Sequence, residues 1–295
     1  MTDSIDAYLD RLRSELKGSD PALIQDALSD SEEHLRSALD TVLGETPGLT
    51  EVEALPALFE KYGDPAEVAA AYQDVEALLT PFHTAALPPP SRSFISRFFR
   101  ILAEPKAWGA FLYTLLAFLF GMIYCAWAVV GGAVAIPSLL FIVGVPLTTL
   151  FLLSLRGFGL LEGRIAEALL GVRMPRKPFF VNRDEKLTTK FKSLYTEALT
   201  WKILLYMLLQ FPLGLLYLGI VWGTFLLAFA FVTAPVFELI FHIPLDLVET
   251  DRFTPLWLLP FVFLAGLFLL PATLHLARWV GKLHGRYAKA MLVRK

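Results

Sequence analysis

The sequence predicts an all-α integral membrane protein, with a small soluble four-helix domain followed by a transmembrane helical bundle of about four spans. The 295-residue chain is 56% hydrophobic, with a mean hydropathy of +0.57, which is too apolar for one ordinary soluble domain. Residues 1–80 carry 18 Asp/Glu against five Lys/Arg, a net charge of −13, whereas the remainder carries 10 against 21, a net charge of +11. Such a split indicates parts with different surroundings. We therefore predict a helical domain at 1–80, a linker at 81–106 and a transmembrane domain at 107–295.

Helix-capping signals divide residues 1–80 into four short helices. Asp20-Pro21 supplies a cap and a first-turn proline. Thr50 and Glu53 form a capping box, in which the glutamate reaches back to the amide of the cap residue. Gly63-Asp64-Pro65 ends one helix and begins the next. Apolar residues recur at helical spacing between these signals, so a bundle with one small core is expected.

These residues resemble the HAAS signalling domain of bacterial membrane and regulatory proteins. The resemblance covers residues 4–80 and lies in Tyr8-Leu9-x-x-Leu12, Glu32-Glu33-His34 and Tyr62-Gly63-Asp64-Pro65 followed by Val68-Ala69. It implies a role in regulation, often alongside PadR-type transcription factors. It supplies no catalytic residues, and we interpret His34 as a half-exposed side chain on an acidic helix.

A proline-rich stretch at 85–93 marks the domain boundary. It is followed by a segment, 91–106, in which four basic residues alternate with phenylalanine, isoleucine and leucine. This pattern predicts a basic amphipathic helix on an anionic membrane surface, so membrane lipids are expected partners.

Four apolar runs are long enough to cross the roughly 30 Å hydrocarbon core, and in lipid they should be helical. They are Trp108–Val130, Val134–Leu155, Trp201–Leu227 and Leu256–Val280. We expect the first two to be joined at Gly131-Gly132. The continuation of the third run, 228–241, is apolar but contains Pro235, and we expect it to lie at the interface or to re-enter the membrane.

Lysine and arginine predict the orientation. Residues 156–202 contain 10 Lys/Arg and the C-terminal tail is basic, whereas 236–255 has only Arg252 beside four acidic residues. The positive-inside rule then places the N-terminal domain and the C-terminus in the cytoplasm of a multi-pass protein of the inner (plasma) membrane.

An internal repeat divides the transmembrane domain into units at about 107–172 and 200–295. Trp108-x4-Tyr113-x-Leu-Leu-x-Phe-x2-Gly121 returns as Trp201-x4-Tyr206-x-Leu-Leu-x-Phe-x2-Gly214. The unit ends, 159–170 and 281–292, are identical at seven of twelve positions and predict a short amphipathic helix after each hairpin. Two parallel repeats suggest a pseudo-two-fold axis along the membrane normal.

The transmembrane region resembles the sensor domain of bacterial signal-transduction proteins, in which a similar four-helix unit often precedes a histidine kinase. The resembling residues are the two Trp-x4-Tyr hairpins, Gly144-Val145-Pro146 and Leu161-Glu162-Gly163-Arg164, within about 100–295. No kinase module follows here, so we expect any output to pass through the N-terminal domain or a partner.

Three sets of residues are candidate sites. Gly159, Gly163, Gly281 and Gly285 form two Gly-x3-Gly motifs for close helix packing, and the terminal helices are expected to pair, either as static packing or as a switch. Arg164 and Arg286 occupy equivalent repeat positions and are candidates for contact with lipid headgroups or the acidic domain.

The third set is an outer segment with Glu238, His242 and Asp246, the candidate sensing element. Glu238 and His242 share one helix face, but a metal would need further ligands, so no metal site is predicted.

No HExxH, CxxC, GxSxG or P-loop motif is present, and we predict neither an enzyme nor a cofactor. The best hypothesis is a membrane sensor that relays an envelope signal through its acidic domain to a basic cytoplasmic partner, for example a PadR-type regulator. The acidic charge disfavours direct nucleic-acid binding, and the domain could also dock on the protein's own basic loop and tail. A transport-associated subunit and a lipid-binding scaffold are the alternatives, and a homo-oligomer is left open.

Overall fold

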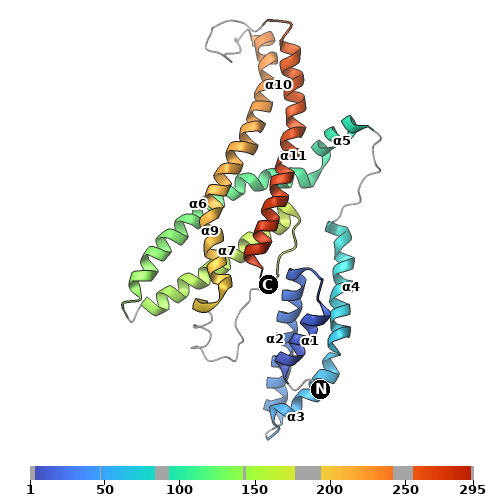
Figure 1. Ribbon diagram of the computed structural model, residues 1–295, viewed down its shortest axis with the longest axis vertical. Helices are drawn as coiled ribbons and strands as arrows, with labels where there is room; N and C mark the ends of the chain where they lie inside the picture. Colours follow the sequence, from blue (N-terminus) through green and yellow to red (C-terminus); the bar gives the residue numbers. More distant parts are fainter. Residues whose placement is uncertain are drawn as a thin grey trace.

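The computed structural model describes residues 4–46, 48–83, 93–141, 144–176, 194–241 and 255–293, and every regular element in these ranges is helical. The predicted all-α class is thereby confirmed. Figure 1 shows a four-helix domain at one end of the molecule and two long helical hairpins that diverge from a shared crossing. The C-terminal end of the chain lies between the hairpins and the four-helix domain.

The N-terminal domain consists of α1 (Ile5–Glu15), α2 (Pro21–Glu45), α3 (Glu51–Tyr62) and α4 (Pro65–His83). The expected caps are present. Asp20 Oδ1 accepts from the amide of Ala22 (2.9 Å), and the amide of Thr50 donates to Glu53 Oε2 (3.0 Å). The hydroxyl and then the amide of Thr50 lower the pKa of the Glu53 carboxyl.

Tyr8 anchors the core of this domain, together with buried leucines from α1, α2 and α3. Its ring stacks on Phe59 with the centroids 5.1 Å apart, and its hydroxyl donates to the carbonyl of Gly63 (2.8 Å). Burial raises the pKa of the Tyr8 phenol well above its usual value. Gly63 has φ +111°, which an L side chain rarely adopts, so glycine lets the chain turn sharply into α4.

The first hairpin consists of α6 (Pro105–Ser138) and α7 (Gly144–Leu170). The predicted turn at Gly131-Gly132 is wrong, because α6 continues through both glycines to Ser138. A Cβ on Gly131 would lie 2.2 Å from the ring of Phe151, so this glycine permits close contact between α6 and α7.

The second hairpin pairs a 44-residue helix with α11 (Leu259–Leu292). The long helix comprises α9 (Ala198–Tyr217), a π-helical turn at Leu218–Trp222 and α10 (Gly223–Phe241). Residues 228–241, expected at the interface or as a re-entrant segment, belong to this continuous helix. α10 continues in line and packs along α11, where a Cβ on Gly266 would lie 2.8 Å from Phe231 Cβ. Pro235 removes one backbone donor, and this packing compensates for the loss.

The unit ends are likewise not separate. Residues 159–170 and 281–292, predicted as short amphipathic helices, are the last turns of α7 and α11. Four helical segments among the described residues are therefore long and apolar enough to cross a membrane: Pro105–Ser138, Gly144–Leu170, Ala198–Phe241 and Leu259–Leu292. The chain is a membrane protein.

Equivalent residues of the two repeats meet where α6 crosses α9. A Cβ on Gly121 would lie 2.7 Å from the carbonyl oxygen of Gln210, and one on Gly214 would lie 2.6 Å from that of Ala117. Each glycine thus faces the same part of the other helix, and the rings of Phe118 and Phe211 lie 6.1 Å apart between them. These reciprocal contacts define a pseudo-two-fold axis through the crossing.

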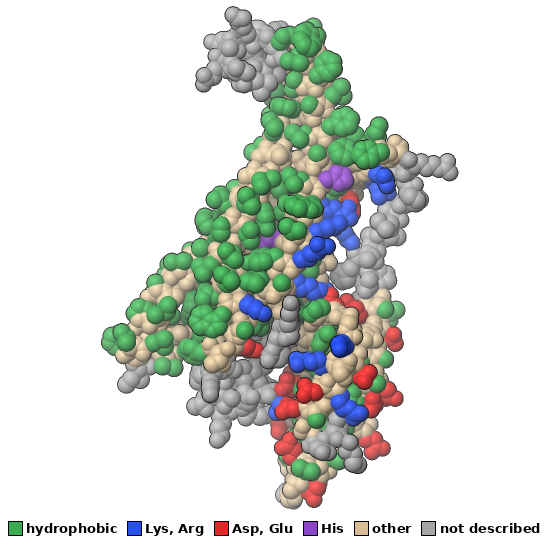
Figure 2. Space-filling view, in the orientation of Figure 1, with side chains coloured by type: hydrophobic (Ala, Val, Ile, Leu, Met, Phe, Trp, Pro, Cys, Tyr) green, Lys and Arg blue, Asp and Glu red, His purple; other side chains and the backbone are tan. Residues whose placement is uncertain are grey.

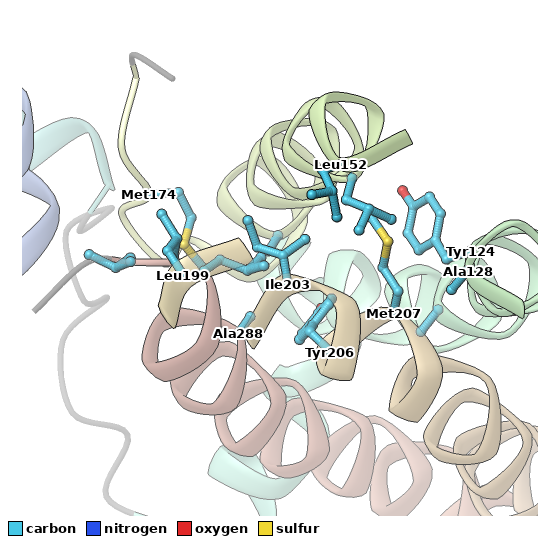
Figure 3. Packing of buried hydrophobic residues seen from close by; sticks show 14 of the residues in the cluster. Tyr124, Ala128, Leu152, Met174, Leu199, Ile203, Tyr206, Met207 and Ala288 are labelled. Carbon is cyan, nitrogen blue, oxygen red and sulfur yellow. The ribbon is translucent and has the colours of Figure 1, made fainter. Parts of the chain in front are cut away.

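The hydrophobic core surrounds α9. Figure 3 shows Met207 of α9 beside Leu152 of α7 and Tyr124 of α6, with Ile203 and Tyr206 of α9 in the same cluster. α5 (Phe94–Arg100) and a 3₁₀ turn at Ile101–Ala103 lie beside α11. There His275 Nε2 lies 3.3 Å from the carbonyl oxygen of Phe98, which holds the linker helix against the bundle.

Candidate functional site

The most polar part of the membrane domain lies where the tyrosines of the two Trp-x4-Tyr motifs meet. Tyr113 of α6 donates to Oε1 of Glu162 on α7 (2.6 Å), and Tyr206 of α9 donates to the same oxygen (3.1 Å). Gln210, one turn along α9, adds its Nε2 (3.2 Å). All four side chains are 1% exposed or less. Three donors on one oxygen compensate for removing the carboxyl group from water.

His284 of α11 extends this hydrogen-bonded group across the pseudo-two-fold axis. Its Nε2 lies 2.9 Å from the Tyr206 hydroxyl, and its Nδ1 lies 3.0 Å from the hydroxyl of Tyr217. The Tyr206 hydroxyl has one hydrogen and gives it to Glu162, so His284 Nε2 must carry the hydrogen of its own bond to Tyr206. A continuous chain of five hydrogen bonds thus joins α6, α7, α9 and α11. We call this set the polar cluster: Tyr113, Glu162, Tyr206, Gln210, Tyr217 and His284.

The polar cluster follows the internal repeat. Tyr113 and Tyr206 are equivalent, and so are Glu162 and His284. Tyr217 is equivalent to Tyr124, which lies beside Glu162 and interacts with it, although its hydroxyl does not reach hydrogen-bonding geometry with any described residue. Each hairpin therefore supplies one ionisable group and two tyrosines. Ionisable side chains inside spanning helices are costly and mark functional sites.

Two ion pairs follow the same symmetry at the end of the bundle where α6 and α9 begin, which we call the base. Arg156 of α7 donates to Glu197, the residue before α9 (2.6 Å), and Arg278 of α11 donates to Glu104, the residue before α6 (2.6 Å). Each hairpin is thereby tied to the start of the other. The first pair is the more buried, and Arg156 also bonds the hydroxyl of Thr200 (2.9 Å).

The acidic domain contacts the membrane domain at this base. Arg173 forms ion pairs with Glu76 and with Asp26 (3.3 Å to Oδ2), and the backbone amide of Arg176 donates to Asp26 Oδ1 (2.7 Å). Lys289, near the end of α11, pairs with Asp20. Figure 2 shows acidic side chains gathered over the four-helix domain and basic side chains following the lower part of α11 toward it. We call these contacts the dock.

A small cavity of about 40 Å³ lies behind the dock. Its lining includes Gln25 of the acidic domain, Arg156 and Gly159 of α7, and Leu292 of α11. The acidic domain therefore reaches the residues that tie the two hairpins together, and a movement of α7 or α11 changes the surface on which it rests.

The four predicted glycines lie in tight packing, but the two motifs do not face each other. A Cβ on Gly159 would lie 3.3 Å from Ile203 of α9, and one on Gly163 would lie 3.6 Å from Met174. Cβ atoms on Gly281 and Gly285 would lie 3.0 and 2.5 Å from Leu170 and Val172. α11 thus packs against the end of α7 and the residues just after it.

The two equivalent arginines have different surroundings. Arg164 donates to Glu167 (2.6 Å) and to the carbonyl of Pro175 (3.2 Å), so it holds the segment that carries Arg173. Arg286 is exposed on α11. The acidic domain is bound by Arg173, Arg176 and Lys289 instead.

The predicted sensing segment is only partly described. Glu238 lies in α10 and is 6% exposed, whereas His242 and Asp246 lie outside the described residues. An apolar groove of about 450 Å³ lies beside it, lined mainly by residues around Pro235 and Pro260. Within the part of the chain that the structure describes, no three His, Cys, Asp or Glu side chains are grouped for a metal ion.

Sequence reasoning missed the polar cluster, although the repeat contained it. Extending the first motif by three residues reaches Tyr124 and Tyr217, and the unit ends align Glu162 with His284. The structure shows that these two different residues join through Tyr206.

Comparison with known proteins agrees with the membrane architecture. The family model described as "Sensor: Putative sensor" matches residues 113–292, well over half of the chain and both hairpins. No family match covers the residues that resemble a HAAS domain, so that resemblance stays a prediction. No curated protein and no solved structure matches the chain. The match over 113–292 places the protein in this sensor family.

Proposed function

We propose that the protein is a non-enzymatic sensor of the bacterial inner membrane that relays a membrane or envelope signal through its acidic domain to a cytoplasmic partner. The observation that carries this proposal is the dock. Four contacts from Asp20, Asp26 and Glu76 hold the acidic domain against Arg173, Arg176 and Lys289. The Arg173–Glu76 and Lys289–Asp20 pairs are partly exposed, which suits a contact that must open, whereas Asp26 is buried against Arg173.

A route from the membrane to the dock supports a relay. Lys289 belongs to the same helix as His284, and Arg173 follows directly on the helix that contains Glu162. A signal that changes how the hairpins cross would shift both ends of the dock together. The acidic domain would then be docked in one state and released in the other, a two-state element that both the membrane and the partner bias.

The charge distribution supports the orientation. Lys and Arg gather on the side of the bundle where both hairpins begin and end, and by the positive-inside rule this distribution favours a cytoplasmic dock and cytoplasmic chain termini.

Release would expose carboxylates that the dock covers. Such a surface suits a protein with a positive face, and a PadR-type transcription regulator is the example that the HAAS resemblance suggests. The acidic charge repels nucleic acid, so we assign no direct nucleic-acid binding.

Membrane lipids are the second class of partner. α5 exposes Phe94 and Ile95 together with Arg97 and Arg100, a combination that suits an anionic membrane surface. Arg286, exposed on α11, is available for the same headgroups.

Disulfide trapping in the full-length protein tests the dock. In a Cys125→Ala background reconstituted into lipid nanodiscs, Glu76→Cys with Arg173→Cys should form a disulfide rapidly at low salt, because the Lys289–Asp20 pair still holds the dock, and slowly at high salt, which screens that pair. Glu60→Cys with Arg173→Cys is the matched control, because Glu60 is exposed on α3 and takes no part in the dock. Equal trapping of both pairs would contradict the proposal.

Capture by the full-length protein in nanodiscs tests the relay. A charge-reversed Arg173→Glu variant should hold the acidic domain less and retain more of a basic regulator than the unaltered protein. Capture of an ATPase instead would favour the transport-associated alternative, and capture that ignores the substitution would contradict release as the relay step.

A further inference from the structure

The two oxygens of the Glu162 carboxyl group lie in different surroundings. Oε1 accepts hydrogen bonds from Tyr113 (2.6 Å), Tyr206 (3.1 Å) and Gln210 (3.2 Å). Oε2 is buried, and no described residue donates to it. A neutral carboxylic acid has this asymmetry, because its carbonyl oxygen only accepts whereas its other oxygen carries a hydrogen.

We propose that Oε2 of Glu162 is a proton-binding site, so that the polar cluster is a receptor for one proton in the middle of the two-hairpin bundle. A proton from water would bond to Oε2 and convert the buried carboxylate into a carboxylic acid, which raises the charge of the cluster by one. The proposal does not depend on the dock.

Both charge states fit the same hydrogen bonds. Oε1 accepts from its three donors whether or not Oε2 carries a proton. The new O–H has acceptors nearby, since Gln210 Oε1 and the Tyr124 oxygen are buried and have no partner among the described residues.

His284 is the other group in the cluster that could take up the proton, and its bonds disfavour it. Nε2 already carries the hydrogen that bonds Tyr206, so only Nδ1 could accept another. Nδ1 accepts from the Tyr217 hydroxyl at 3.0 Å, and protonation there would reverse that bond.

The other groups around Glu162 do not supply a compensating charge. The titratable side chains in the cluster and packed against it are Tyr113 and Tyr124 of α6, Tyr206 and Tyr217 of α9, and His284 and Tyr287 of α11. Arg156 and Arg278 are held by Glu197 and Glu104 at the base. A buried carboxylate without a cationic partner is neutralised most cheaply by a proton.

Infrared difference spectroscopy of the full-length protein in nanodiscs tests this site directly. Lowering the pH should produce the carbonyl stretching band of a protonated, hydrogen-bonded carboxyl group that shifts in D₂O. Glu162→Gln should remove the band. Glu238→Gln is the matched control, because Glu238 is also a buried carboxyl group in a spanning helix and its replacement should leave the Glu162 band in place.

A second variant covers the case in which Glu162→Gln does not fold. Tyr113→Phe removes the 2.6 Å hydrogen bond to Oε1, so the band should move to higher wavenumber by more than in Tyr217→Phe, which removes a hydroxyl that bonds His284 and not Glu162. A band unchanged in Tyr113→Phe and in Glu162→Gln would overturn the proposal. So would a folded protein with no such band at any pH, or with a pH-dependent imidazolium signal that His284→Gln abolishes.

Discussion

The two hairpins share one plan and differ at the positions where function is expected. Both begin with a glutamate and a tryptophan whose Nε1 donates to a preceding carbonyl, at Leu102 O (2.8 Å) and Tyr195 O (2.9 Å). Both cross the other at a glycine, and both send an arginine to the partner's first glutamate. At the centre, however, the first hairpin supplies Glu162 and the second His284. Equivalent backbones therefore build the scaffold, and divergence at single positions makes it chemically asymmetric.

The same divergence occurs at the base. Glu167 of the first hairpin is equivalent to Lys289 of the second. Glu167 accepts from Arg164 within its own hairpin, whereas Lys289 reaches Asp20 of the acidic domain. An exchange of charge at one repeated position thus gives the second hairpin a contact that the first lacks.

Substitutions at the crossing should have the largest effect and should affect both hairpins alike. Gly121→Ala and Gly214→Ala would place a Cβ within 2.5–2.7 Å of backbone atoms, which cannot move aside as a side chain would. We expect each to lower the free energy of unfolding by about 2–3 kcal/mol, measured by thermal or denaturant unfolding in detergent. Gly219→Ala is the control, since nothing lies within 4 Å of its Cβ position. Unequal losses at Gly121 and Gly214 would contradict the equivalence of the two hairpins at the crossing.

The two equivalent ion pairs should contribute differently to the free energy of unfolding, because they differ in burial. Glu197→Gln leaves the buried Arg156 without its carboxylate, and we expect a loss of about 2 kcal/mol. Glu104→Gln removes the equivalent partner of the more exposed Arg278, and a loss below about 1 kcal/mol is expected. Unfolding in detergent measures both, and equal losses would show that burial does not distinguish the pairs.

Removing the hydroxyl group should lower stability at one of the two equivalent tyrosines and not at the other. Tyr217→Phe removes a hydrogen bond to His284 and should cost about 1 kcal/mol. Tyr124→Phe removes a hydroxyl outside hydrogen-bonding geometry and should be close to neutral. Unfolding in detergent measures both losses. A larger loss in Tyr124→Phe than in Tyr217→Phe would show that Tyr124 holds the cluster together.

Reversing charge at the base should weaken the dock with little effect on unfolding. Lys289→Glu gives the second hairpin the charge of the first and places two carboxylates together at Asp20. The change in unfolding free energy should stay within about 0.5 kcal/mol, while disulfide trapping between Glu76→Cys and Arg173→Cys should slow several-fold. Lys282→Glu, exposed on α11, is the matched control, and equal slowing there would point to a general charge effect.

The sequence predicted the positions of the helices better than the places where they turn or contact one another. Apolar length and capping residues predicted the four short helices and the four spans, because these signals act locally. The predicted turn at Gly131-Gly132 was wrong because the sequence alone does not distinguish a glycine at a turn from one at a close helix contact. Here the facing ring of Phe151 explains the glycine at position 131. Pro235 does not interrupt the helix, because packing of α10 on α11 compensates for one lost hydrogen bond.

The site was less predictable for a similar reason. Glu162, Tyr206 and His284 lie on three different helices, and only the crossing of α6 and α9 brings them together. The repeat aligns Glu162 with His284, but two different residues at equivalent positions give no indication that both contact the same tyrosine. Lys289 and Asp20 are equally distant in the sequence, so charge predicted docking in general but not these partners.

Cross-linking at the crossing tests the account most directly, because the polar cluster exists only if equivalent residues of α6 and α9 meet. In a Cys125→Ala background, Phe118→Cys with Phe211→Cys should be joined rapidly by a short bifunctional thiol reagent in nanodiscs. The control pair, Leu119→Cys with Leu216→Cys, replaces two exposed side chains of the same helices and should react slowly. Fast joining of the first pair alone is predicted, whereas no joining of it, or equal joining of both pairs, would contradict the account.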